Sequence, residues 1–214
     1  MIRIPRFSAR LLVIASIVVL VIAGLIGGVL YWLNVQQTRA TTAYAEALVR
    51  AQAGRTAQAT PEARAAAAQA IEAVLQRYPT AGMAGQAAYE LAGLRYTDHQ
   101  YAAARSAYEI AAGRSPGTTL RTVSRVGIAY TWEAERNYPK AIESFQALLA
   151  EARPGDFLYE DLLIDLAVAQ ELAGRRDDAV QSYRRILKDV PKTRRAEDIR
   201  ARLASLGATL DGAR

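Results

Sequence analysis

Residues 162–191 read LLIDLAVAQELAGRRDDAVQSYRRILKDVP. The stretch contains two runs with apolar residues at helical spacing, and it ends at Pro191. In the second run Ala179, Tyr183 and Ile186 are separated by four and then three residues, which places them on one face of a helix. The small residue allows a neighbouring helix to approach, the larger ones fill the space beside it, and the proline stops the helix. The segment therefore predicts two helices joined by a tight turn.

The same pattern occurs three more times upstream. Each copy has three residues at matching offsets ahead of a proline: Ala67, Ile71 and Val74 before Pro79; Ala104, Tyr108 and Ala111 before Pro116; Ala141, Phe145 and Leu148 before Pro154. The first residues of successive sets are 37, 37 and 38 residues apart. A steady period of this length is typical of stacked repeat units. The alternative is a plain antiparallel helix bundle, in which this register would be a coincidence.

The pattern resembles the tetratricopeptide repeat, a helical hairpin with small, aromatic and small residues and a closing proline at these offsets. The last unit is the best match, because Leu166, Ala167 and Gly174 also stand where the family has such residues. The resemblance implies an α-solenoid of about four hairpins that binds other proteins. We therefore expect an all-α fold with a repeat domain over 55–193 and a capping helix and tail over 194–214.

The first unit departs most from the family pattern. Its second helix has a clear start, with Thr60 as the N-cap, Pro61 in the first turn and Glu62 at the positive end of the helix dipole. The preceding segment, 34–54, lacks the signature and is predicted to be a connecting helix that continues from the apolar stretch before it.

That apolar stretch is LLVIASIVVLVIAGLIGGVLYWL, residues 11–33, which contains no charge. A helix of this length spans roughly 34 Å, enough to cross a hydrocarbon core of about 30 Å. Tyr31 and Trp32 stand at one end, where amphipathic rings prefer the membrane interface. The segment predicts a transmembrane helix in contact with the lipid bilayer. Gly24 and Gly28 form a GxxxG pair, a spacing that permits lateral pairing of such helices.

The flanking charges predict the orientation of this helix. Arg3, Arg6 and Arg10 give residues 1–10 a basic character, so the N-terminus is expected in the cytoplasm and the repeats across the membrane. For a bacterial inner membrane this is the periplasm. A cleaved signal peptide is the main alternative, although its apolar core should be about 7–15 residues long. A mitochondrial transit peptide is a second alternative, but it would be amphipathic.

Composition excludes several kinds of site. The chain has no cysteine, which rules out disulfides, thiolate metal sites and cysteine nucleophiles. Its net charge of +6 is divided between the basic N-terminus and a soluble part with 24 basic and 21 acidic residues, without a basic stripe interleaved with aromatics. Nucleic-acid binding is therefore not predicted.

No catalytic constellation is evident. The single histidine, His99, stands in a predicted turn, where a solvated side chain is the ordinary expectation. The densest acidic cluster, formed by Asp156, Glu160, Asp161 and Asp165, lies near a helix start and suits the helix dipole. Glycine-rich phosphate loops and activated serines are absent from the sequence. We expect no catalytic residues, metal ions or cofactors.

The resemblance implies a partner-binding groove lined by the first helix of each hairpin. By register, its predicted residues are Gln86, Tyr89, Tyr96, Tyr130, Glu133, Asp161 and Glu171. Tyrosine offers a large contact area with a polar tip at low entropic cost, which suits an interface. Neighbouring apolar positions such as Val126, Ile164 and Val168 are equally explained as core.

The order of basic N-terminus, anchor, continuing helix and repeats resembles the membrane-anchored ancillary subunit of the bacterial Sec translocon, the YfgM-like group. That resemblance implies a periplasmic repeat domain that contacts translocon components or periplasmic chaperones. Two alternatives remain open: an envelope scaffold for outer-membrane assembly or cell division, and an anchored accessory of a membrane enzyme complex.

Overall fold

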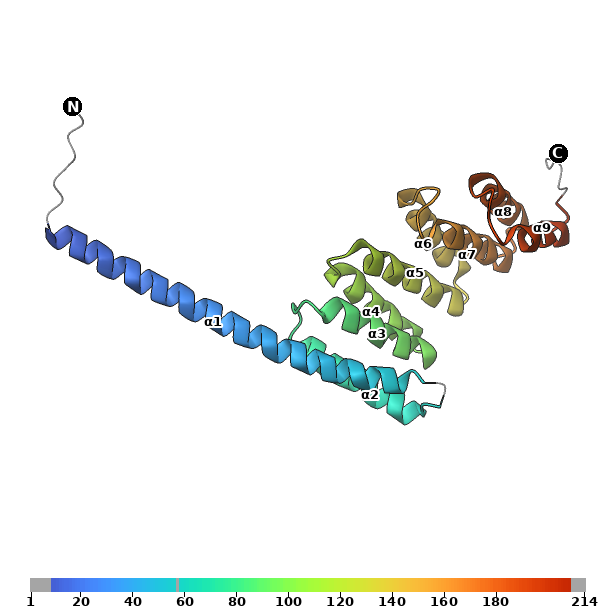
Figure 1. The fold of residues 1–214 in the computed structure, drawn as a ribbon. Coiled ribbons are helices and arrows are strands. Elements are labelled where there is room, and N and C mark those ends of the chain that lie inside the picture. Colours follow the sequence, from blue (N-terminus) through green and yellow to red (C-terminus); the bar gives the residue numbers. More distant parts are fainter. Residues whose placement is uncertain (1–8, 57, 209–214) are drawn as a thin grey trace, which may run out of the picture.

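The computed structural model describes residues 9–56 and 58–208, with side chains described from residue 17 onward. Within these ranges the chain forms nine helices and no strand (Figure 1). They are α1 (Ala9–Gly54), α2 (Pro61–Arg77), α3 (Ala84–Thr97), α4 (Tyr101–Arg114), α5 (Thr118–Ala134), α6 (Tyr138–Glu151), α7 (Tyr159–Leu172), α8 (Arg176–Asp189) and α9 (Ala196–Ser205). The predicted all-α fold is confirmed. Arg3 and Arg6 of the predicted cytoplasmic segment lie outside the described residues.

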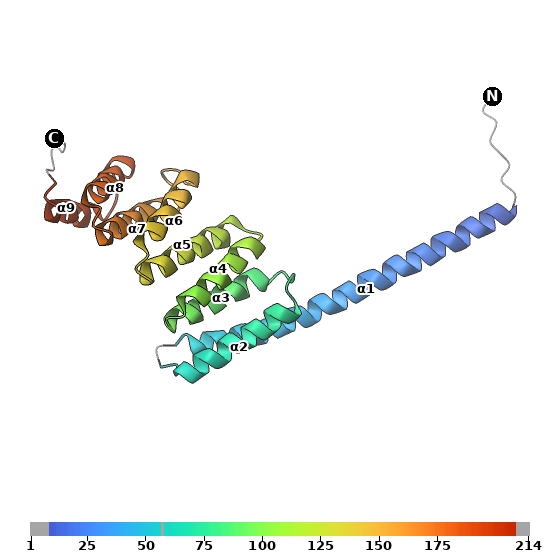
Figure 2. The ribbon, with the colours of Figure 1, turned by 180° about the vertical axis from the view of Figure 1, so that it is seen from behind.

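The longest helix, α1, contains 46 residues and is therefore roughly 69 Å long. Its N-terminal half extends away from the other helices, whereas its C-terminal half lies along α2 (Figures 1 and 2). The buried residues of that second half, spaced four, three and four apart, form one stripe: Ala40, Tyr44, Ala47 and Ala51. The predicted transmembrane and connecting segments are thus parts of one continuous helix, and the second part serves as the first helix of the first hairpin.

The helices pack in chain order as stacked hairpins. α1 pairs with α2, α3 with α4, α5 with α6 and α7 with α8, and α9 packs on α8 (Figure 1). The small residue of each predicted unit lies in the core, with at most 2% of its surface exposed: Ala67, Ala104, Ala141 and Ala179. Burial of the same position in all four units confirms the repeat register.

One turn geometry recurs between the two helices of a hairpin. His99, Arg136 and Gly174 each have a positive φ, of 59°, 58° and 73°. In each turn the amide of the next residue donates a hydrogen bond to the carbonyl five positions earlier, at 2.8–2.9 Å, which closes the helix as in a Schellman motif. The same motif follows α9, with Gly207 at φ 66°. α9 therefore ends in the way that the first helix of a hairpin ends.

The second helix of the first hairpin begins as the sequence predicts. The Thr60 side chain accepts a hydrogen bond from the amide of Ala63 at 3.2 Å, and Pro61 occupies the first turn. Such a cap satisfies one of the amides that an α-helix leaves without a partner at its start.

The buried apolar side chains form two clusters, one from α1 to α4 and the other from α5 to α9. α5 joins the clusters, because Ile128 packs against the first and Ala129 belongs to the second. At this junction the ring of Tyr108 covers Gly127 so closely that a β-carbon on the glycine would lie 2.5 Å from the ring. Glycine is what permits α4 and α5 to approach here.

Candidate protein-binding face

The seven predicted groove residues all lie on the first helices of the hairpins, α3, α5 and α7. The structure does not bring them into one continuous group. Two tyrosines and two acids on neighbouring helices influence one another, whereas the other three residues stand apart or serve the packing of a hairpin.

Tyr89 belongs largely to the packing between helices. Its ring lies edge-to-face on Tyr108 of α4, with the ring centroids 5.6 Å apart and the planes at 62°. Burial raises the pKa of Tyr108 to about 12, and the neighbouring Tyr89 adds to the shift. Tyr89 is half-buried, so only part of its ring is available to a partner.

Tyr96 lies nearer the surface at the end of α3. Its ring packs edge-to-face on Tyr101, with centroids 5.3 Å apart. Burial is the main cause that raises the pKa of Tyr96, and the negative charge of Glu133 on α5 also contributes. Tyr96 and Glu133 belong to successive hairpins, α3–α4 and α5–α6.

Tyr130 connects α5 to α7. Its hydroxyl donates a hydrogen bond to Oδ2 of Asp165 at 2.7 Å, and its ring lies edge-to-face on Phe145 with centroids 5.8 Å apart. Even so, 37% of its surface remains exposed. Burial, followed by the hydrogen bond to Asp165, raises the pKa of Tyr130. Tyr130 thus presents an exposed ring whose orientation is held from two sides.

Three carboxylates surround this tyrosine. Burial raises the pKa of Glu133, and the nearby Asp165 raises it further. Burial likewise raises the pKa of Asp165, while the hydrogen bond from Tyr130 opposes the shift. Asp161 is compensated at the edge of the group by Arg195, with Nη1 and Oδ1 2.6 Å apart. Glu133 and Asp165 are therefore two partly desolvated carboxylates that influence each other, and Arg195 lies at the edge of the group.

We call Tyr96, Tyr130, Glu133, Asp161 and Asp165 the tyrosine–acid face. It crosses three successive hairpins and combines aromatic rings with carboxylates, which suits a partner that carries lysine or arginine side chains. Asp165 is absent from the predicted groove set, although it provides the central hydrogen bond. Its position four residues after Asp161, on the same face of α7, is the signal that could have identified it.

Two predicted groove residues have other surroundings. Gln86 lies exposed in the first turn of α3. Glu171 accepts a hydrogen bond from the Tyr183 hydroxyl at 2.6 Å and lies 3.8 Å from Arg202, so it helps to hold α8 and α9 against α7. These contacts give Glu171 a role in packing. Gln86 makes none of the contacts that define the tyrosine–acid face.

Two further polar features lie outside the tyrosine–acid face: the other acidic side chains and His99. Within the part of the chain that the structure describes, no three histidine, cysteine, aspartate or glutamate side chains are placed to hold a metal ion. His99 lies in its turn with Nδ1 2.7 Å from the Tyr101 hydroxyl, an exposed contact between neighbours in sequence.

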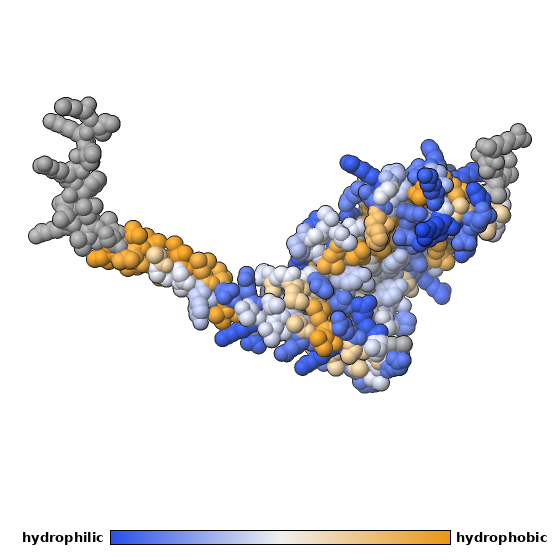
Figure 3. All heavy atoms as spheres, in the orientation of Figure 1, coloured by the Kyte–Doolittle hydropathy of each residue, from blue (hydrophilic) through white to orange (hydrophobic). Residues whose placement is uncertain are grey.

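The N-terminal half of α1 is a candidate membrane span, because it is long and apolar enough to cross a bilayer. Its side chains from Ile17 to Leu33 are exposed, and they form the hydrophobic arm in Figure 3. A row of exposed leucine, isoleucine and valine side chains of this size is unstable in water and needs an apolar cover. Gly24 and Gly28 have no other side chain within 4 Å of a built β-carbon, so the surface beside them is open.

Stacked helical hairpins whose first helices carry an exposed face define the class of α-solenoid repeat proteins. A family model, that of the tetratricopeptide repeat-like domain, matches residues 9–208. The chain belongs to this family, whose members typically act as protein-interaction scaffolds without catalysis. No curated protein matches the chain. The family match extends from α1 through α9 and so covers both the apolar arm and the repeats.

Proposed function

We propose that the protein is a membrane-anchored scaffold that binds a positively charged segment of another protein along the tyrosine–acid face. The observation that carries this proposal is the pair of neighbouring carboxylates, Glu133 and Asp165, whose pKa values are raised by burial. Lysine or arginine side chains would compensate these charges on binding, and the exposed ring of Tyr130 would add apolar contact.

The anchor is proposed to place the repeats in the bacterial periplasm. The apolar arm of α1 and the arginines ahead of it support an N-terminus in the cytoplasm. A reporter that is active only outside the cytoplasm, fused after Arg214, is expected to be active. Activity of a cytoplasmic reporter alone would contradict this orientation. A mature protein that begins after Leu33 would show that the segment is a cleaved signal.

Within the envelope, we propose an ancillary role in protein translocation or periplasmic chaperoning. The single continuous helix that joins the anchor to the first hairpin supports this role, because it holds the repeats close to a membrane complex. A scaffold for outer-membrane assembly or cell division and an accessory of a membrane enzyme complex are the competing assignments. Recovered partners distinguish them: translocon subunits and chaperones, division or outer-membrane factors, or subunits of an enzyme complex.

The binding face itself is tested by removing its charges. The full chain would be purified from detergent-solubilised membranes as the wild type and as the double variant Glu133→Gln, Asp165→Asn. We expect the variant to recover much less of the partner, because both carboxylates lose their charge while keeping their size. The control is Glu109→Gln with Glu143→Gln, two exposed acids on α4 and α6. Equal loss in both double variants would point to a general effect of net charge and refute the assigned face.

A further inference from the structure

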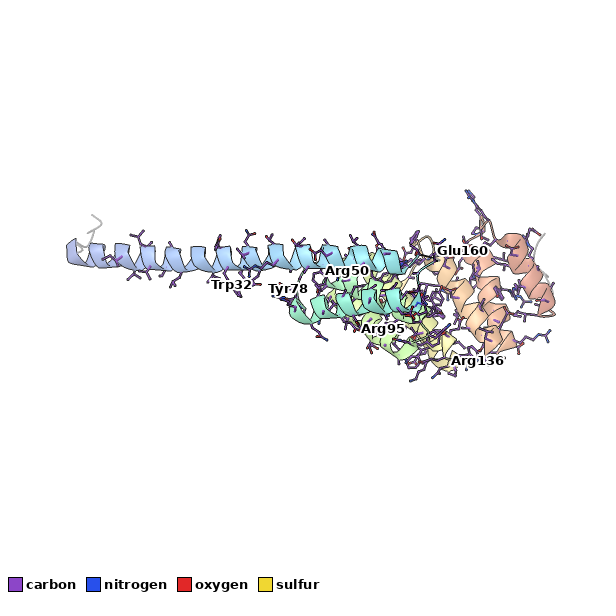
Figure 4. All side chains as sticks on the ribbon, turned by 90° about the horizontal axis from the view of Figure 1, so that it is seen from below. Trp32, Arg50, Tyr78, Arg95, Arg136 and Glu160 are labelled. Atoms are coloured by element: carbon purple, nitrogen blue, oxygen red, sulfur yellow. The ribbon has the colours of Figure 1, made fainter. Side chains whose placement is uncertain are left out.

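A cavity lies where the apolar arm of α1 (17–33), here called the membrane arm, meets the first repeat. It encloses about 610 Å³ between α1 and the turn that joins α2 to α3. Figure 4 shows the Tyr78 end of α2 lying beside α1 close to Trp32. The cavity lies apart from the tyrosine–acid face, and the core residues Ala40 and Tyr44 form part of its wall.

The wall of this cavity is fixed to α1. Tyr44 is fully buried, and its hydroxyl donates a hydrogen bond to the backbone carbonyl of Tyr78 at 2.9 Å. This contact ties the α2–α3 turn to the side of the anchor helix. The turn therefore keeps a constant height along α1.

The lining changes from apolar to polar along the helix. Trp32 and Leu33 form the end nearest the membrane arm and are 60% and 45% exposed. Polar side chains follow, on both α1 and the turn: Gln36, Gln37, Thr41 and Thr80. Arg77 is the one charged side chain among the described residues that line the cavity, and none of them is acidic.

Arg77 is available to an anion. It lies over the Tyr78 ring at 5.6 Å from the centroid, and it makes no ion pair with the residues that the structure describes. A guanidinium presents a fork of N–H donors that matches the oxygens of a phosphate. The cavity thus combines a free cation, hydroxyl and amide groups, and an apolar floor.

The end of the cavity nearest Trp32 lies at the height of the lipid headgroups. The apolar run of α1 ends at Leu33, and the helix wall of the cavity extends from Trp32 to Tyr44. At 1.5 Å per residue this wall starts at the hydrocarbon boundary and rises about 18 Å above it. The headgroup layer occupies about the first 5–8 Å of that height.

We infer that this cavity binds the headgroup of an anionic phospholipid, with its phosphate on Arg77 and its acyl chains along the membrane arm below Leu33. The inference rests on the proposed anchoring of α1. A bound lipid would set the tilt of the repeats relative to the membrane, because the cavity joins the anchor to the first hairpin.

Native mass spectrometry of the full chain in dodecyl maltoside micelles tests this site. The micelles would be supplemented with either phosphatidylglycerol or phosphatidylcholine, and the bound lipid counted. We expect the wild type to retain phosphatidylglycerol preferentially, and Arg77→Gln to weaken that retention by about fivefold. Gly82→Trp, at an open position of the cavity lining, is expected to reduce the binding of both lipids. Arg50→Gln, an exposed site farther along α1 (Figure 4), is expected to match the wild type.

Equal retention of phosphatidylglycerol by Arg77→Gln and the wild type would overturn the site. Binding of soluble glycerol 3-phosphate as tightly as phosphatidylglycerol would assign the cavity to a free phosphate compound and overturn the lipid. The intact mass of the same sample, prepared from membranes, reports on the anchor independently. Loss of residues 1–33 from that mass would refute the anchoring. A full-length chain that retains phosphatidylglycerol equally well with and without Arg77→Gln would refute the lipid site alone.

Discussion

The ring of Tyr108 on α4 lies directly over Gly127 on α5, at the place where the two hydrophobic clusters of the solenoid meet. Three ring atoms would lie 2.5–2.7 Å from a β-carbon on the glycine. The contact therefore couples the first two hairpins to the last two, and a single methyl group would disturb it. Stacked repeats depend on such nearest-neighbour interfaces for their common stability.

The first prediction follows from that contact. Gly127→Ala should destabilise the repeat domain by about 1–3 kcal/mol, because the ring of Tyr108 is buried and has little room to move. Gly113→Ala is the control, since it also lies in a helix but has nothing within 4 Å of its β-carbon. That variant should become slightly more stable, as alanine favours helix over glycine. Thermal unfolding of the detergent-solubilised chain would show the opposite signs, and a gain in both variants would contradict the close packing.

The second prediction concerns the recurring turn. Arg136 adopts a left-handed conformation, with φ at 58°, that costs an L-residue about 1–2 kcal/mol. Arg136→Gly should therefore raise the unfolding free energy by about 0.5–1 kcal/mol, the strain relief being partly offset by the freer unfolded chain. Glu135→Gly, one residue earlier with φ at −77°, should bring no gain. Gly174→Ala should lose stability, and a neutral outcome there would argue against the shared turn geometry.

These turns show why the sequence predicts the repeats better than the connections. A small residue that recurs at a constant period in the sequence predicts a buried position in each unit, because only a small residue fits between touching helices. Among the three hairpin turns, the sequence predicts the left-handed conformation only at Gly174, because glycine is the residue that adopts it without strain. At His99 and Arg136 ordinary residues adopt the same conformation, since the helices on either side determine it.

The candidate site shows a similar limit. Helical register predicts that Tyr96, Tyr130 and Asp161 lie on the first helices of successive hairpins, but it does not report which side chains meet across them. The hydrogen bond from Tyr130 to Asp165 spans 35 residues, and Glu171 is drawn into packing by Tyr183. Such contacts depend on the rotation between hairpins, which a repeat pattern leaves open.

The third prediction concerns pH. Burial raises the pKa of Asp165 above its ordinary value of 3.8, so the folded state binds this proton more tightly than the unfolded chain does. The carboxylate therefore costs stability as the pH rises through the folded pKa. Asp165→Asn should unfold at a higher temperature than the wild type at pH 7, and the difference should disappear near pH 4.

A matched control for this pH effect has the opposite sign. Glu151 accepts hydrogen bonds from Arg125, which lower the pKa of Glu151 below its ordinary value of 4.5. Glu151→Gln should therefore lose stability at neutral pH and match the wild type only in acid. Thermal unfolding of both variants across about pH 3–8 gives the comparison. Asp165→Asn melting below the wild type at pH 7 would contradict the burial of this charge.

The last prediction separates binding from stability among the tyrosines. Tyr89 packs on Tyr108 inside the hairpin stack, so Tyr89→Ala should lower the melting temperature and weaken binding only through unfolding. Tyr130 is more exposed, and Tyr130→Phe keeps the ring contact with Phe145 while removing the hydroxyl that orients Asp165. Tyr130→Phe should therefore fold normally and bind a basic partner somewhat less well.

Combining Tyr96→Ala with Tyr130→Ala should weaken partner binding by about tenfold or more, because interface aromatics often contribute about 2 kcal/mol each. Tyr138→Ala is the control, since this tyrosine lies on α6 and is not one of the residues that define the tyrosine–acid face. Both variants lose aromatic area, so we expect a comparable drop in melting temperature. At a temperature where both are folded, only the double variant of Tyr96 and Tyr130 should lose the partner. Loss of binding restricted to temperatures above melting would assign Tyr96 and Tyr130 to packing. Full binding by the folded double variant would place the partner on another surface. Tyr96 on α3 and Tyr130 on α5 are the two aromatic residues in the definition of the tyrosine–acid face, so a partner that binds this face must lose contact area when both are removed.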